Sequence, residues 1–143
     1  MHRFTYSLLP HVGDWREAQI VQRAYELNVP VVCVADQKKA PSIPIEPATG
    51  IASFCFIQVD CAHVIVETVK PAEDGDGLIV RLYEAHNQRG RGTLTFVTSI
   101  LSAQECNLLE EPINDVSCQG NTLSFQVRPF EIKTFRVHLA PER

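Results

Sequence analysis

The clearest structural signal in this sequence is residues 64–84, VIVETVKPAEDGDGLIVRLYE. Two apolar runs flank an acidic turn, EDGDG at residues 73–77, which contains two glycines. The first run is rich in β-branched residues, and the second is apolar apart from Arg81. Because Asp-Gly steps reach positive φ at low steric cost, the pattern predicts a β-hairpin with its turn at residues 73–77.

The chain around this hairpin predicts more short strands joined by turns. They are expected at residues 51–59, 61–70, 78–85, 93–98, 105–109, 122–128 and 130–139. Alternation places five side chains inward, namely Leu94, Phe96, Leu123, Phe125 and Val127. The parity of the apolar residues changes at Lys133 and Thr134, which predicts a bulge or bend there. Short strands with little helix predict a mainly β fold, an antiparallel β-sandwich.

The N-terminal part predicts a strand followed by a helix. Residues 4–9 are apolar on both faces and end at Pro10, so we expect an interior strand whose neighbours are missing from this chain. DWRE at residues 14–17 has capping-box spacing and predicts the start of one amphipathic helix of about four turns. Asn28 and Pro30 end it. Packing against the sheet is favoured over binding of a partner protein.

Residues 31–35 predict a short buried strand, and the three prolines in residues 36–47 predict an extended linker. We therefore expect three parts. Residues 1–40 form a strand-helix-strand segment, residues 41–50 a Pro-rich linker, and residues 51–143 a small β-sandwich domain.

Composition argues against several classes of protein. The net charge of −4 disfavours nucleic acid as a partner. No apolar run approaches the roughly 20 residues of a membrane-spanning helix, and the N-terminus does not resemble a signal peptide. The cysteines are odd in number and form no CxxC pair, which favours a reduced, cytoplasmic location. They are Cys33, Cys55, Cys61, Cys106 and Cys118. The first three are expected to be small core residues.

No motif for catalysis or metal binding is present. The acidic turn could hold Ca²⁺ but lacks the ligand spacing of an EF-hand, so a solvated turn is favoured. The histidines form no zinc spacing, although a cluster formed only by folding stays open. They are His2, His11, His63, His86 and His138. We therefore expect no catalytic, cofactor-binding or metal residue in this chain.

Four other side chains invite a choice between two roles. Arg89 and Arg91 could contact a phosphate or a sugar hydroxyl, although a solvated turn is favoured. Arg81 interrupts an apolar face and requires a partner, for which Glu67 on the preceding strand is expected. Trp15 could stack on a sugar, but packing on the adjoining strand is favoured.

Five blocks taken together resemble a known family. They are HRFTYSLLPHVGDW (residues 2–15), AYELNVP (24–30), VIVETVKPAEDGDGLIVRLYEAHNQRG (64–90), NLLEEP (107–112) and PFEIKTFRV (129–137). In this order they resemble the C-terminal end of α-mannosidases of glycoside hydrolase family 38, most closely the bacterial and cytosolic-type branch.

The resemblance implies a part without catalytic residues. In that family the zinc ion, its ligands and the nucleophilic carboxylate lie in an N-terminal domain, and none of those motifs occurs here. The resemblance also implies that residues 1–40 are the closing strand-helix-strand segment of a larger central β domain, and that residues 51–143 are the small C-terminal β-sandwich domain. The C-terminal β domains of the family brace the catalytic domain and help to wall the substrate cleft. The implied partners are thus the catalytic and central domains of a zinc-dependent, retaining α-mannosidase. The chain alone is expected to be inactive, and its residues 4–8 to drive self-association.

The alternative is a free-standing carbohydrate-binding or protein-interaction sandwich. It predicts a monomer with a sugar site lined by aromatic side chains. The chain has one Trp, three Tyr and seven Phe, mostly at inward positions, which weighs against this alternative. A chain that is itself a hydrolase is the least favoured possibility.

Overall fold

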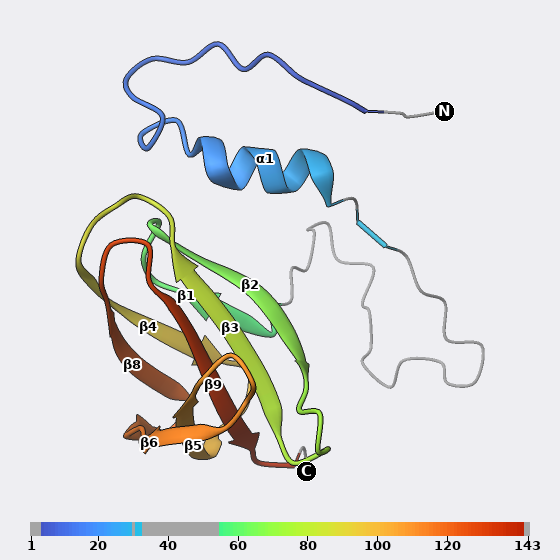
Figure 1. The fold of residues 1–143 in the computed structure, drawn as a ribbon, viewed down its shortest axis with the longest axis vertical. Coiled ribbons are helices and arrows are strands. Elements are labelled where there is room, and N and C mark those ends of the chain that lie inside the picture. Colours follow the sequence, from blue (N-terminus) through green and yellow to red (C-terminus); the bar gives the residue numbers. More distant parts are fainter. Residues whose placement is uncertain (1–3, 30, 33–54, 142–143) are drawn as a thin grey trace, which may run out of the picture.

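The computed structural model describes residues 4–29, 31–32 and 55–141. Two antiparallel sheets pack face to face, and the helix lies beyond one end of them (Figure 1). One sheet has the order β1 (Ile57–Val59), β4 (Gly90–Phe96), β8 (Thr122–Val127), β7 (Cys118–Gln119). The other has the order β2 (Val64–Pro71), β3 (Leu78–Glu84), β9 (Ile132–Leu139), β5 (Ile100–Cys106), β6 (Pro112–Asp115). The predicted mainly β sandwich is confirmed.

The hydrophobic core fills the space between the two sheets. Every side chain that alternation placed inward is buried, which confirms that prediction for β4 and β8. The five-stranded sheet supplies Val80, Leu82, Phe135 and Val137. The rings of Phe125 and Phe135 meet across the sheets, with centroids 5.9 Å apart. Burial of this apolar surface is the main favourable contribution to folding.

The predicted hairpin is also confirmed. β2 and β3 pair antiparallel from Val64 opposite Glu84 to Pro71 opposite Leu78. Gly75 and Gly77 in the connecting turn have φ of 79° and 93°, a region that favours glycine. One feature was not expected, because the register shifts between Val66 and Thr68 and leaves residue 67 in a bulge.

The bulge predicted at Lys133 and Thr134 is wrong. β9 pairs with β3 without a register shift from Tyr83 opposite Ile132 to Leu78 opposite Val137. The apolar parity changes because Ile132 belongs to the outer face of the sheet, where it is exposed. A register shift does occur on the other side of β9, within β5, between Ile100 and Ser102.

Other strand predictions differ at their ends. The strand expected at residues 105–109 is displaced toward the N-terminus, since β5 ends at Cys106. The short strands β6 and β7 were not predicted. Of the strand expected at residues 51–59, residues 57–59 form β1 and residues 51–54 lie outside the described residues.

Residues 4–10 form no strand, contrary to the prediction. Phe4, Tyr6 and Leu8 are 80%, 82% and 90% exposed. A strand needs a neighbouring strand to pair its backbone N–H and C=O groups, and the sheets of the described part offer none at this segment. Val31 and Val32 are likewise exposed and not in a strand. The rest of that expected strand and the linker to residue 50 lie outside the described residues.

The helix α1 spans Ile20–Asn28 and is shorter than the four turns predicted. The capping box does form, because the Asp14 carboxylate accepts hydrogen bonds from the N–H groups of Arg16 and Glu17 at 2.8 and 3.0 Å. Gln19, however, has a left-handed φ of 52°. The capped turn is therefore a separate turn before the helix. The predicted packing of α1 on the sheet is slight, because α1 has no buried residue.

Candidate functional site

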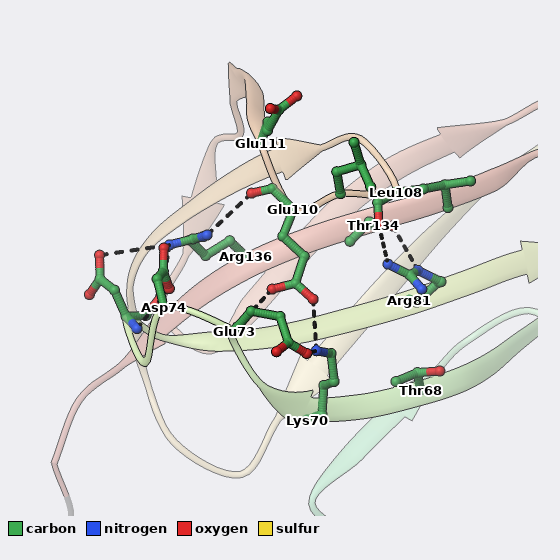
Figure 2. A network of polar contacts seen from close by, with 12 residues as sticks. Thr68, Lys70, Glu73, Asp74, Arg81, Leu108, Glu110, Glu111, Thr134 and Arg136 are labelled. Atoms are coloured by element: carbon green, nitrogen blue, oxygen red, sulfur yellow. Dashed lines mark hydrogen bonds and ion pairs between the residues drawn. The ribbon is translucent and has the colours of Figure 1, made fainter.

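A polar network covers the outer face of the five-stranded sheet (Figure 2). It connects the β2–β3 turn, the loop of residues 107–111 between β5 and β6, and strand β9. We call it the outer-face network. Its members are Lys70, Glu73, Asp74, Arg81, Leu108, Glu110, Thr134 and Arg136. Three of the sequence blocks that carry the family resemblance meet here.

Glu110 is the centre of the outer-face network. Its carboxylate lies 2.8 Å from the Lys70 ammonium and accepts a hydrogen bond of 2.9 Å from the Glu73 N–H. Its backbone carbonyl accepts a hydrogen bond of 3.2 Å from Arg136. The Lys70 hydrogen bond, followed by that of the Glu73 N–H, lowers the pKa of Glu110. The ionised side chain thereby ties the loop to the hairpin.

Arg136 holds the acidic turn. Its guanidinium donates hydrogen bonds to the Asp74 carboxylate at 2.7 Å and to the Asp76 carbonyl at 3.2 Å. The Asp76 carboxylate also lies 3.0 Å from His138 Nε2. The Asp76 N–H and then Arg136 lower the pKa of Asp74. The turn is exposed, as predicted, but its carboxylates bind cationic or imidazole side chains of the same domain.

Arg81 does not pair with Glu67, so that prediction is wrong. It donates hydrogen bonds of 3.1 Å to the Thr134 hydroxyl and of 3.1 Å to the Leu108 carbonyl. The bulge at residue 67 is the reason, because it places Thr68 opposite Arg81 in the ladder. Arg81 therefore ties the loop of residues 107–111 to strand β3 through the Leu108 carbonyl.

The outer-face network positions an apolar loop tip. The Asn107 carboxamide oxygen accepts hydrogen bonds from the N–H groups of Leu109 and Glu111 at 2.9 and 3.1 Å and closes the loop. Leu108 and Leu109 are left exposed. The carboxylates and cations beneath them are engaged with one another. The arrangement is therefore suited to holding two leucines at the surface rather than to general acid-base chemistry.

A second cluster attaches the N-terminal segment to the sandwich. The Trp15 ring meets the His86 ring edge-on, with centroids 5.2 Å apart. Arg16 donates a 3.0 Å hydrogen bond to the His86 carbonyl, and its guanidinium lies 4.6 Å from the centre of the Trp15 ring. We call these three residues the joint. Trp15 thus packs on the loop after β3 and not on the adjoining segment, contrary to the prediction.

Glu84 fixes the loop that carries the joint. It is fully buried, and its carboxylate accepts hydrogen bonds from the N–H groups of His86 at 2.7 Å and Phe130 at 2.9 Å. Burial raises the pKa of Glu84, but the hydrogen bonds from Phe130 and His86 lower it further, so that the net shift is downward. An ionised carboxylate in this position couples the β3–β4 loop to the β8–β9 turn.

The remaining candidate residues do not converge. Cys55 is exposed, contrary to the prediction, while Cys61 packs against the core and burial raises its pKa to about 11. Cys33 and His2 lie outside the described residues. Within residues 4–29, 31–32 and 55–141, no three His, Cys, Asp or Glu side chains are placed to hold a metal ion. In the same ranges, no helix has the length and apolar character to cross a membrane.

Sequence reasoning missed Glu84, Glu110 and Arg136. No local pattern marks them, because each is buried by segments far away in the chain. It did single out Arg89 and Arg91, which the structure places at a pocket of about 600 Å³ beside the β8–β9 turn.

Comparisons with known proteins give a consistent result. Residues 63–135 match the family described as glycosyl hydrolases family 38 C-terminal beta sandwich domain. The chain is 33% identical over 145 residues to alpha-mannosidase 2C1 of Homo sapiens, and the matched region covers 98% of this chain and 13% of that protein. It is 36% identical over 141 residues to alpha-mannosidase G of Dictyostelium discoideum, and the matched region covers 94% of this chain and 12% of that protein. The chain thus spans a small fraction of the length of these relatives.

Proposed function

The chain belongs to the C-terminal β-sandwich domain family of glycoside hydrolase family 38, and from this premise we propose that it braces the catalytic domain of a larger α-mannosidase. The domain is a non-catalytic part of such enzymes. The proposal concerns its role, which is to dock on the central and catalytic domains and to support the substrate cleft. The parent activity proposed is zinc-dependent, retaining hydrolysis of α-mannosides in the cytoplasm.

The observation that carries this proposal is the exposed apolar N-terminal segment. Phe4, Tyr6 and Leu8 project into solvent, while the joint fixes the segment's far end to the sandwich. Exposed apolar side chains in a row are typical of a surface that another domain covers. The domain that covers the N-terminal segment would then also contact the sandwich.

Zinc belongs to the proposed catalytic domain of the parent. The described histidines and acids of this chain do not fit a zinc site, because no three of them gather at one point. A free-standing sugar-binding module is not favoured at the strand positions, because Phe96, Phe125 and Phe135 are buried in the core. The prediction that most Phe side chains lie inward is wrong, since Phe4, Phe56 and Phe130 are exposed.

The test is hydrolysis of a chromogenic α-mannoside by the purified chain, with and without added Zn²⁺ or Co²⁺. The expected result is no turnover under either condition. Metal-dependent turnover that survives a second purification would overturn the proposal, because it would require an active site within this chain.

A second test addresses the exposed segment itself. We expect the chain to self-associate in sedimentation experiments, and the double variant Tyr6→Ser/Leu8→Ser to shift it toward the monomer. Leu101→Ser is the matched control, because Leu101 is 67% exposed on the sandwich. Equal association by both variants would argue against a docking role for residues 4–9.

A further inference from the structure

We propose that the sandwich carries a binding site for a phosphorylated small molecule, at the end of β4 and β8 that faces the β8–β9 turn. The site is a pocket of about 600 Å³. Six polar side chains line it, namely Arg89, Arg91, Gln126, Arg128, Glu131 and Lys133. This proposal is independent of the bracing role.

The charge of the pocket is opposite to that of the chain. The whole chain has a net charge of −4, yet four of the six polar side chains here are cationic. Lys133 is paired with Glu105 at 2.6 Å. In the part of the chain that the structure describes, none of the guanidinium groups of Arg89, Arg91 and Arg128 forms an ion pair. Three positive charges therefore converge on one concavity.

The single acid among the lining residues does not neutralise these arginines. The Glu131 carboxylate accepts a 2.7 Å hydrogen bond from the Arg128 N–H and lies 3.9 Å from Lys133. Guanidinium groups donate hydrogen bonds in a planar fork that matches the oxygens of a phosphate. An oxyanion is the ligand chemistry that satisfies three such groups.

The backbone beneath the arginines is fixed. Arg91 lies opposite Gln126 in the β4–β8 ladder, and Arg128 directly follows β8. Gly90, between Arg89 and Arg91, packs so closely that a Cβ atom would lie 2.3 Å from His63 Nε2. The side chains thus start from a rigid platform, which reduces the entropy lost on binding.

The volume identifies the class of ligand further. Pockets that enclose small organic molecules measure about 300–1,000 Å³, so a bare phosphate ion would leave most of this one empty. A phosphate group attached to a polar body, such as a sugar, fits the charge, the hydrogen-bond donors and the size together. Inorganic phosphate shares the anionic chemistry and is the other source to be distinguished.

The experiment is calorimetric titration of the full chain with mannose 6-phosphate, inorganic phosphate and mannose. Saturable binding of mannose 6-phosphate is expected, weaker binding of phosphate and none of mannose. Equal affinity for mannose 6-phosphate and inorganic phosphate would show that the pocket binds the free phosphate ion, and would overturn the proposal of a phosphorylated small molecule. Arg128→Gln should weaken binding about tenfold, the effect of losing one charge-assisted hydrogen bond. Arg23→Gln, on the exposed face of α1, is the matched control and should leave affinity unchanged.

A second readout does not depend on variants. Phenylglyoxal labels accessible guanidinium groups, and mass spectrometry reports each arginine separately. Mannose 6-phosphate should protect Arg89, Arg91 and Arg128 but not Arg23. Absence of saturable binding and of protection would overturn the proposal. Protection by an acidic peptide alone, with none by either phosphate, would also overturn it, since the patch would then dock another protein.

Discussion

Replacing the buried carboxylate of Glu84 by a carboxamide should destabilise the domain strongly. Glu84→Gln keeps the shape of the side chain and one acceptor oxygen. The other oxygen, which accepts from a backbone N–H of His86 or Phe130, becomes an NH₂ group facing a donor. The loop between β3 and β4 and the turn between β8 and β9 then lose their shared anchor.

The size of the effect follows from these two hydrogen bonds. A hydrogen bond to a charged group contributes about 1.5–3 kcal/mol, and a buried donor left unpaired costs about 1–3 kcal/mol. We therefore expect the free energy of unfolding at pH 7 to fall by about 3 kcal/mol. For a domain of this size that loss corresponds to a drop in Tm of roughly 12–24 °C.

Urea denaturation followed by two signals would measure this effect. Circular dichroism reports the sheets, and fluorescence of Trp15, the single tryptophan, reports the joint. Glu26→Gln is the matched control, because Glu26 is exposed on α1 and should change stability by no more than about 0.5 kcal/mol.

The pH dependence supplies an independent check. Because the folded-state pKa of Glu84 is lowered, its ionised form stabilises the fold above the unfolded-state pKa of about 4.3. That stabilisation is lost as the pH falls through the lower, folded-state pKa. The difference between the natural chain and Glu84→Gln should therefore narrow below about pH 4.3. A loss below about 0.5 kcal/mol at pH 7, or a difference that stays constant down to about pH 2, would refute this reasoning.

Three further outcomes are expected. Leu94→Ala should lower the free energy of unfolding by about 3 kcal/mol in urea titrations, while Leu101→Ala on the exposed face should change it little; equal effects would contradict the assigned core. Gly92→Ala would place its Cβ 2.6 Å from Phe125 Cζ and should cost about 1–3 kcal/mol, visible as a lower Tm. Glu110→Gln should make the free energy of unfolding less sensitive to acid, because the lowered folded-state pKa of Glu110 gives the natural chain stability above about pH 4.3 that protonation removes. Thermal unfolding from pH 7 to 3 that is the same for the variant and the natural chain would exclude this.

The parts of the fold that could be predicted are those that local chemistry determines. Two Asp-Gly steps specify the hairpin turn at residues 73–77, and the period-2 alternation around Leu94 and Phe125 specifies which face is buried. The left-handed Gln19, which cuts the helix short, has no such signal. Neither has the bulge at residue 67, which places Thr68 rather than Glu67 opposite Arg81.

The candidate sites were less predictable for a related reason. Glu110 sits in an ordinary polar loop sequence, and its burial exists only because Lys70 and Arg136 reach it from other strands. Sequence separation hides such partners. Arg89 and Arg91 were singled out as a weak phosphate signal, and only the fold places Arg128, which directly follows β8, at the same pocket.

The position of β9 sets the order in which the domain can form during synthesis. It is the last of the described strands in sequence, yet it lies in the middle of the five-stranded sheet, between β3 and β5. Until β9 has left the ribosome, the β2–β3 hairpin and the β5–β6 pair have no shared neighbour, and both expose unpaired edges. The five-stranded sheet therefore cannot be completed before β9 is available. Chains that end before Phe135 would present aggregation-prone edges to chaperones and proteases.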